Sequence, residues 1–300
     1  MGTPEFAVPS LDILVQKGYN VVAVITSTDK YGGRGGKKLL ESPVKKYAVE
    51  HNIPVLQPKN LKSPEFIEEL RTFNADLQMV VAFRMLPEVV WNMPSLGTYN
   101  LHGSLLPKYR GAAPINWAII NGDKVTGVTT FKLKHEIDTG DLILQKEVDI
   151  LETDDAGNVH DKMMVIGAKA VLETIQLIKS GKVKMKPQDA ALVSKAPKIF
   201  HKDCEINFEQ YGVDIINFIR GLSPYPAAWM AIDEREMKVF KAQWKPVTHN
   251  IPCGKVYTDN KNHLSIFCSD GIISVEDIKM QGKKRMDIKS YLNGNTILLK

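Results

Sequence analysis

The chain has 300 residues, enough for two domains with sizeable hydrophobic cores. Hydrophobic residues make up 44% and charged residues 24%, a balance typical of globular proteins. No apolar run reaches the roughly 18 residues that a membrane span needs, and the N-terminal residues lack the pattern of a signal peptide. Three cysteines without metal-ligand spacing predict a reduced, cytoplasmic protein that binds no metal. The lack of a long apolar run predicts that it binds no membrane.

The formal net charge is +5, and the excess of cations is in the C-terminal third. Residues 1–190 carry 23 Lys and Arg against 22 Asp and Glu, whereas residues 191–300 carry 16 against 12. This bias is compatible with a polyanionic partner, although many small basic domains bind no nucleic acid.

The first half of the chain alternates strand and helix patterns. Two helices are predicted to begin at Pro43 and Pro64, because each proline follows a serine that can cap a helix. A long helix is predicted over 154–179, where apolar residues recur every three or four positions. Apolar runs that predict strands lie at 20–27, 77–83, 97–102, 125–133 and 142–150.

This alternation predicts an α/β fold, with a Rossmann-like, mainly parallel sheet and helices on both faces. We assign it to residues 1–186 and interpret 187–205, which has several lysines and little periodicity, as a basic linker. Residues 206–300 contain one helical pattern and then short strand patterns separated by turns, which predict a smaller, OB-like β-barrel domain.

One segment of the first domain combines groups that suit catalysis. Asn100 and His102 lie at the end of a predicted parallel strand, the edge at which open α/β sheets bind ligands. Residues two apart on a strand project to the same side, so an amide donor and an imidazole enter one space. Asp138 lies in a short loop between two later strands.

An amide donor, a base and a carboxylate together suit acyl transfer, because the amide stabilises an oxyanion and the carboxylate supports the protonated imidazole. Each residue also has a structural interpretation. A histidine beside a turn is more often structural, and Asp138 suits a tight turn without any catalytic role. His135 is a rival base on the same loop, and Ser104 lacks the glycines of a nucleophile elbow.

The segment resembles the signature of the folate-dependent formyltransferases. The shared motifs are Asn100-Leu101-His102, the S-L-L-P turn at 104–107 and Asp138-Thr139-Gly140. The resemblance extends over the chain, to "MGTPEFAVPSL" at the start, "APKI" at 196–199, "IRGLSPYPAAW" at 219–229 and "GKKRM" at 282–286.

This resemblance implies that the chain transfers the formyl group of 10-formyltetrahydrofolate to the α-amino group of methionine esterified to initiator tRNA. It implies Asn100, His102 and Asp138 as catalytic residues, with His102 as the base and no metal. The folate is expected against Ser104, Leu105, Leu106 and Pro107, with Phe83 and Leu86 as apolar walls. The role of Arg84, beside Phe83, stays open.

A glycine-rich basic stretch at 31–39 is predicted to be a flexible loop that contacts tRNA phosphates, since it lacks the pattern of a P-loop. A mobile surface loop is the alternative from composition alone, and the resemblance favours the tRNA role. The expected tRNA contacts are Arg34, Lys37, Lys38 and, in the linker, Lys198 with Lys195 as a weaker candidate. The protein is expected to be a monomer.

Three other functions compete with this interpretation. A sugar-nucleotide formyltransferase would share the folate and catalytic residues, but the basic loop and basic C-terminal region argue against it. A hydrolase of 10-formyltetrahydrofolate and a catalytically inactive RNA-binding protein are further alternatives. A dinucleotide-binding dehydrogenase is excluded, because no G-x-G-x-x-G follows a predicted strand.

The N-terminus departs from the family pattern. Family members carry a short apolar strand just before the "GTPEFA" turn, and here Met1 directly precedes that turn. A first strand of the Rossmann-like sheet is therefore expected to be missing from this sequence.

Overall fold

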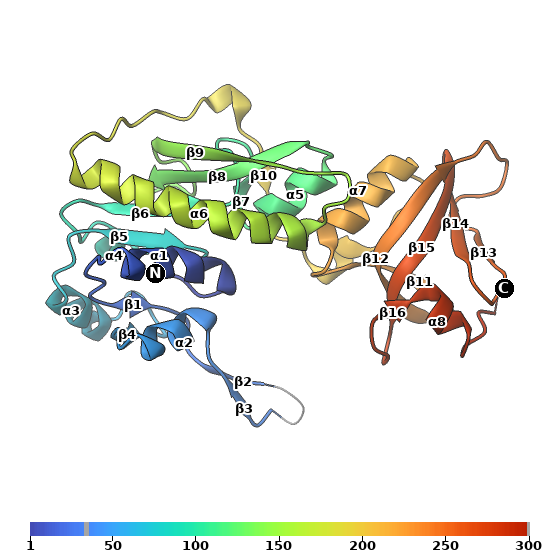
Figure 1. Ribbon diagram of the computed structural model, residues 1–300, viewed down its shortest axis with the longest axis horizontal. Coiled ribbons are helices and arrows are strands. Elements are labelled where there is room, and N and C mark those ends of the chain that lie inside the picture. The colour runs from blue at the N-terminus through green and yellow to red at the C-terminus, as the bar shows by residue number, and fades with distance from the viewer. Residues whose placement is uncertain (33–35, 299–300) are drawn as a thin grey trace. The chain divides into compact units, whose positions relative to one another are not determined.

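The structure is a computed structural model and describes residues 1–32 and 36–298. The chain forms two compact units, each built from separate segments (Figure 1). The first unit comprises Met1–Gly111, Gly127–Val148 and His160–Lys195. The second unit comprises Ala112–Thr126, Asp149–Val159 and Ala196–Lys300. The division at 186 and 205 drawn from the sequence stays a prediction.

Serine caps begin two helices of the first unit, as the sequence predicts. Ser42 Oγ accepts a hydrogen bond from the Lys45 amide at 3.0 Å, and Ser63 Oγ accepts one from the Phe66 amide at 3.4 Å. The helical segments are η1 (Glu5–Ala7), α1 (Val8–Gln16), α2 (Pro43–Glu50), α3 (Pro64–Thr72), α4 (Glu88–Trp91), most of α6 (Ala156–Lys179) and η2 (Ala190–Leu192).

The first unit is Rossmann-like, with mostly parallel pairing near its centre. β5 pairs with β6 in parallel, β1 pairs with β4 in parallel, and β8 is antiparallel to β6. The main sheet has the order β5-β6-β8-β9. The strands are β1 (Val24–Ile25), β2 (Lys30–Gly32), β3 (Lys38–Leu40), β4 (Val55–Leu56), β5 (Gln78–Val81), β6 (Thr98–His102), β7 (Arg110–Gly111), β8 (Val125–Lys132), β9 (Leu142–Asp149) and β10 (Lys195–Ala196).

The first predicted strand, 20–27, is realised only as Val24–Ile25. Met1 and Gly2 lie between β1 and β5, because the Gly2 amide donates to Ile25 O and the Val81 amide donates to Met1 O.

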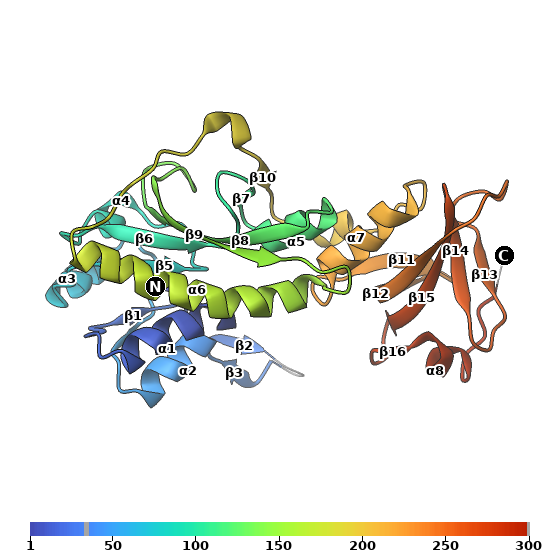
Figure 2. The same ribbon diagram turned by 45° about the horizontal axis from the view of Figure 1, so that its top comes forward.

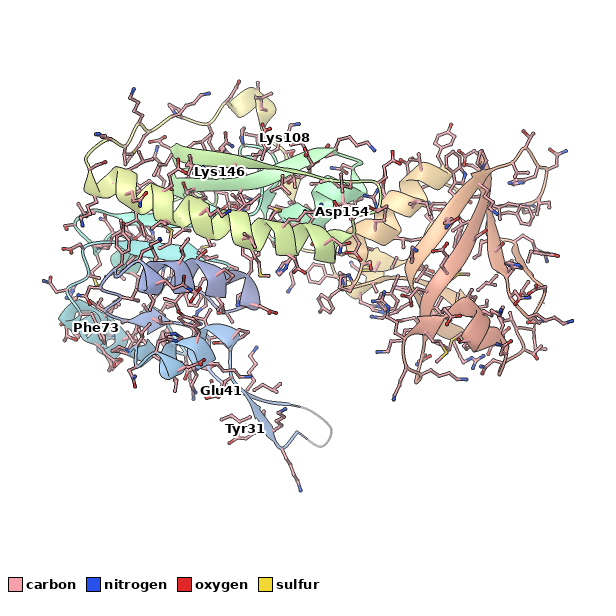
Figure 3. The ribbon with its side chains drawn as sticks, viewed as in Figure 1. Tyr31, Glu41, Phe73, Lys108, Lys146 and Asp154 are labelled. Atoms are coloured by element: carbon pink, nitrogen blue, oxygen red, sulfur yellow. The ribbon has the colours of Figure 1, made fainter. Side chains whose placement is uncertain are left out.

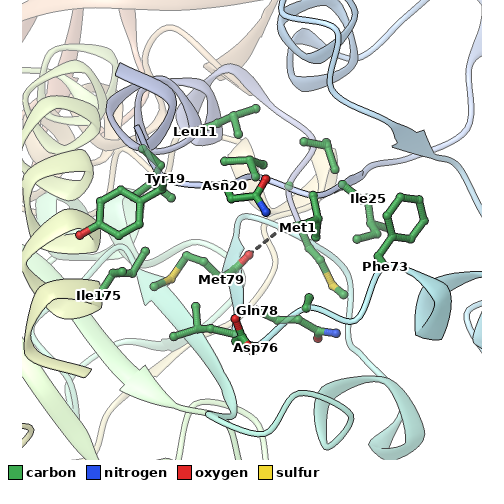
Figure 4. A pocket seen from close by; sticks show the side chains of 18 of the residues that line it. Met1, Leu11, Tyr19, Asn20, Ile25, Phe73, Asp76, Gln78, Met79 and Ile175 are labelled. Atoms are coloured by element: carbon green, nitrogen blue, oxygen red, sulfur yellow. Dashed lines mark hydrogen bonds between the residues drawn. The ribbon is translucent and has the colours of Figure 1, made fainter. Parts of the chain in front are cut away.

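A cavity of about 690 Å³ lies beside Met1, between residues 21–25 and residues 76–79 (Figure 4). Burial lowers the pKa of the Met1 amino group from 8.0 to about 5. The missing first strand stays a prediction.

Strand β6 has two different faces. Its Leu101 side chain contacts α6 at Gly167, where an added Cβ would lie 2.8 Å from Leu101 Cδ2. Thr130 on β8 also faces α6 and shares a hydrogen bond of 2.7 Å with Thr174. Helix α6 thus covers one face of this sheet (Figure 2). Asn100 and His102 are directed to the opposite face, over which the chain passes between residues 180 and 195.

The second unit is built on a curled antiparallel sheet of the barrel type that the sequence predicts. The sheet has the order β11-β12-β15-β14-β13, and β16 also pairs with β15. Its elements are α5 (Pro114–Ile120), η3 (His201–Cys204), α7 (Gly212–Leu222), β11 (Ala228–Ile232), β12 (Arg235–Pro246), β13 (Val256–Thr258), β14 (Leu264–Cys268), β15 (Gly271–Met280), β16 (Met286–Asp287) and α8 (Ile288–Leu292). None of the described helices is long and apolar enough to cross a membrane.

Helix α7 anchors the core of the second unit through Ile219, which is 1% exposed. We predict that Ile219→Ala lowers the free energy of unfolding by about 2–5 kcal/mol, because it deletes buried methyl groups and leaves a cavity. The matched variant Val213→Ala, at a position 49% exposed on the same helix, should change it by less than about 0.5 kcal/mol. Urea unfolding followed by circular dichroism measures both, and equal losses would contradict this core assignment.

Candidate active site

Asn100 and His102 project from the same face of β6, as their spacing predicts. Asn100 is paired with Val80 on β5 and with Phe131 on β8, so its backbone is held from both sides. Its side chain is half-buried, and no other residue among those described forms a hydrogen bond with its amide. The Asn100 amide is therefore available as a donor to a ligand.

His102 is buried at the end of β6. Its Nε2 lies 2.8 Å from Tyr109 O, and because a carbonyl only accepts, Nε2 is the nitrogen that carries the hydrogen. The other ring nitrogen, Nδ1, lies 3.8 Å from Asp138 Oδ2. In the neutral ring Nδ1 has a free lone pair, so it is the atom that can accept a proton beside a carboxylate.

Asp138 lies in the loop between β8 and β9, with a positive φ of 56°. Its Oδ2 accepts a hydrogen bond of 2.9 Å from the Gly111 amide on β7, and its side chain is 13% exposed. The structure therefore brings Asp138 to His102, as predicted. His135, the rival base, is instead 73% exposed in its side chain and lies 3.3 Å from Glu88 Oε1.

The S-L-L-P turn is held mainly by its own neighbours. The Leu106 amide donates to Thr129 Oγ1 at 3.0 Å, and Leu106 O accepts from Gln145 Nε2 at 2.8 Å. The Leu106 side chain is 2% exposed within a small core, and Ser104 Oγ donates to Lys108 O. Leu105 is half-buried, whereas Lys108, which follows the turn, is exposed (Figure 3). Folate contact by 104–107 stays a prediction.

The neighbouring segment after β5 is also anchored in the core. Leu86 is 8% exposed and Phe83 packs against the same cluster, so both support the fold whether or not they contact folate. Arg84 donates hydrogen bonds to the backbone carbonyls of Pro58 and Lys59 and lies over the Phe83 ring. Arg84 thus ties this segment to the loop after β4, which answers the question that the sequence left open.

The basic stretch 31–39, predicted to be a flexible loop, includes parts of two paired strands. β2 pairs with β3, and Lys38 lies within β3 opposite Gly32. Lys37 and Lys38 are exposed, and Tyr31 on β2 is 75% exposed (Figure 3). Arg34 lies outside the described residues. The hairpin therefore presents two lysines, and their contact with tRNA stays a prediction.

The predicted linker residues divide between the two units. Lys195 is exposed in β10 of the first unit. Lys198, in the second unit, is exposed, and its Nζ lies 5.2 Å from the centre of the Phe200 ring. An exposed aromatic ring beside a lysine is a combination used by surfaces that bind unpaired bases.

Sequence reasoning missed the polar groups that support the site. Gln188 and Arg110 bind one another beside Asp138, and Gln145 and Thr129 hold the S-L-L-P turn. Gln188 lies in the segment interpreted as a linker, where no periodicity marks it. Within 1–32 and 36–298, no three His, Cys, Asp or Glu side chains form a group that could hold a metal ion.

Comparison with known proteins shows the family of this chain. The formyl transferase family model matches residues 1–175, and the model of the formyl transferase C-terminal domain matches residues 198–296. The chain belongs to the formyl transferase family.

Individual relatives extend over nearly the full length. The chain is similar to a methionyl-tRNA formyltransferase of Parabacteroides distasonis, with 54% identity over 98% of this chain and 94% of the relative. It is also similar to one of Azobacteroides pseudotrichonymphae, with 51% identity over 100% and 96%. Among solved structures, the sugar 3N-formyl transferase WlaRD has a similar fold, with a TM-score of 0.66 and 22% identity over 94% of this chain and 97% of its own.

Proposed function

We propose that this chain transfers the formyl group of 10-formyltetrahydrofolate to the α-amino group of methionyl-initiator tRNA in the cytoplasm, as a monomer. The observation that carries this proposal is the buried His102–Asp138 pair beside the free Asn100 amide. Relatives named methionyl-tRNA formyltransferase, with about half of their residues identical over nearly the full length, support the acceptor. The similar sugar formyltransferase is far more distant in sequence, at 22% identity.

The reaction requires a proton to leave the amine as its nitrogen attacks the formyl carbon. His102 Nδ1 is suited to accept it, because Nε2 already donates to Tyr109 O. Asp138 then faces the imidazolium that forms. The Asn100 amide donates to the oxygen that becomes negative as the new C–N bond forms. When the bond from the formyl carbon to the folate nitrogen breaks, that nitrogen takes up a proton and tetrahydrofolate leaves.

The acceptor is expected to contact basic groups of both units. In the first unit, the hairpin offers Lys37 and Lys38. The sequence adds Arg34 as an expected contact, and that residue lies outside the described residues. In the second unit, Lys198 with Phe200 offers a charge and an aromatic face. These groups suit phosphates and unpaired bases, as the acceptor end of a tRNA would present. The folate is expected beside Leu105 and Phe83.

We predict that His102 is the base of the transfer reaction. His102→Ala should lower kcat by about 10²–10⁴-fold, the contribution typical of a positioned acid–base group, and Asn100→Ala should lower it comparably. Formyl transfer from 10-formyltetrahydrofolate to methionyl-tRNA measures this. His135→Ala, on the exposed rival, is the control and should keep wild-type kcat. More than a tenth of wild-type kcat in folded His102→Ala would refute the assignment.

We predict that Asp138 supports the protonated form of His102. Asp138→Asn removes the negative charge that lies 3.8 Å from His102 Nδ1, and a nearby negative charge favours the protonated form of a base. Because the unprotonated ring is the active base, the acidic limb of the kcat profile should move to lower pH while kcat falls. The pH profile between 5 and 9 measures this, with His135→Ala again as control. An unmoved limb would remove Asp138 from this role.

We predict that the lysines of the hairpin contact tRNA phosphates. The double variant Lys37→Ala/Lys38→Ala should raise the KM for tRNA and reduce the slope of log KM against log salt by about 2, roughly 1 for each lost phosphate contact. The KM for folate should not change. Lys169→Ala/Lys179→Ala, which removes two exposed charges from α6, is the matched control. An equal salt slope in hairpin and control variants would favour a sugar-nucleotide acceptor instead.

A further inference from the structure

Gln188 reaches the loop that carries Asp138 from a distant part of the chain. Its Nε2 donates to Asp138 O at 2.8 Å and to Gly140 O at 2.9 Å. The segment around it is attached to the same unit on both sides. Lys186 is paired with Leu142 of β9, and the Arg110 amide donates to Ser194 O. Gln188 is therefore held above the site by backbone contacts that do not involve its own side chain.

Arg110 determines how the Gln188 amide is oriented. Its Nε and Nη2 donate to Gln188 Oε1 at 3.0 and 2.7 Å. A guanidinium only donates, so the amide oxygen must face Arg110 and the amide nitrogen must face the two carbonyls. Both hydrogens of the nitrogen then have acceptors, and the side chain has a single satisfied orientation.

The same short strand holds Asp138 in two ways. Gly111, next to Arg110 on β7, donates from its amide to the carboxylate, while Arg110 acts on the loop backbone through Gln188. The second contact matters because Asp138 has a φ of 56°, a left-handed conformation that aspartate tolerates without preferring it, so contacts to the loop backbone help to hold it. At Gly140 an added Cβ would lie 1.7 Å from Lys132 O, so the end of this loop is closely packed.

We propose that Gln188, oriented by Arg110, is a positioning residue that keeps the Asp138 carboxylate beside His102. This inference rests on the proposed function, since it assigns a role within that site. Gln188 acts through the backbone of Asp138 and Gly140 and takes no part in the proton transfer. Losing it leaves two carbonyls without their donor and frees the loop to leave the conformation that places the carboxylate 3.8 Å from Nδ1.

The test is Gln188→Met, which keeps the length and removes the donor without adding charge. We expect kcat to fall about 10–100-fold, the loss that a displacement of about 1 Å causes at a catalytic group. The KM values for tRNA and folate should stay within about twofold. The acidic limb of the kcat profile should move to lower pH, in the same direction as in Asp138→Asn. Gln176→Met, at an exposed position on α6, is the matched control.

A second variant, Gln188→Glu, keeps an acceptor for Arg110 but cannot donate to the carbonyls. Positioning predicts an acidic limb at lower pH here too, whereas a simple effect of the added negative charge would move the limb to higher pH. Thermal unfolding establishes that each variant is folded. If Gln188→Met does not fold, Arg110→Lys replaces it, because lysine cannot form both hydrogen bonds to Gln188 Oε1 and should shift the kcat profile in the same direction by less.

Two results would overturn the proposal. The first is a wild-type kcat in folded Gln188→Met. The second is a lowered kcat in Gln188→Met whose pH profile keeps the wild-type acidic limb, although Asp138→Asn moves that limb. Failure of the proposed function is recognised separately, because wild-type protein would then formylate an amino-sugar nucleotide rather than methionyl-tRNA. In that case the kcat profiles of the Gln188 and Asp138 variants are measured with the amino-sugar nucleotide as acceptor.

Discussion

The candidate site depends on the position of β6 between β5 and β8. Pairing on both sides leaves the side chains of β6 only two directions, one toward α6 and one away from it. Leu101 packs toward Gly167 of α6, so Asn100 and His102 must both face away from the helix. A shift in register by one residue would bury the catalytic pair under α6 and expose Leu101 to the site.

The strand alone does not make a site, because the carboxylate comes from elsewhere. Asp138 lies on the loop after β8, and β8 pairs with β6 so that Thr129 is opposite His102. Its carboxylate is then held by β7 and its backbone by Gln188. Strand β7 and the segment around Gln188 therefore hold the loop of Asp138, and this loop places the carboxylate beside the imidazole on β6. None of these contacts uses the Asn100 amide, which no other described residue binds.

Much of the fold could be predicted because its signals are local. Serine caps and prolines mark the starts of α2 and α3, and apolar runs mark β5, β6, β8 and β9. The prediction was less accurate for segments whose secondary structure depends on pairing with another strand. Residues 20–23 have the composition of a strand, yet only Val24–Ile25 is assigned as one, because pairing requires a partner alongside. Likewise, β2 and β3 form on either side of a glycine-rich connection, which suits a hairpin turn but does not by itself show that the flanking residues pair.

The supporting residues illustrate the same limit. Arg110 and Gln188 are 78 residues apart, and nothing in the sequence indicates that they bind one another. The sequence left the role of Arg84 open, and its hydrogen bonds to the Pro58 and Lys59 carbonyls give it a structural role. Such contacts depend on how loops cross in space, and hydrophobic periodicity carries no information about them.

The sequence by itself determined that Asn100 and His102 share one face of a strand, because side chains alternate along any strand whatever surrounds it. It also determined that Asp138 and Gly140 lie in a tight turn between two strands. Only the tertiary structure decided that the turn meets the histidine, at 3.8 Å, and that Gln188 holds it there. The physical reason is that strand pairing and loop packing, rather than local conformational preference, bring together groups that are far apart along the chain.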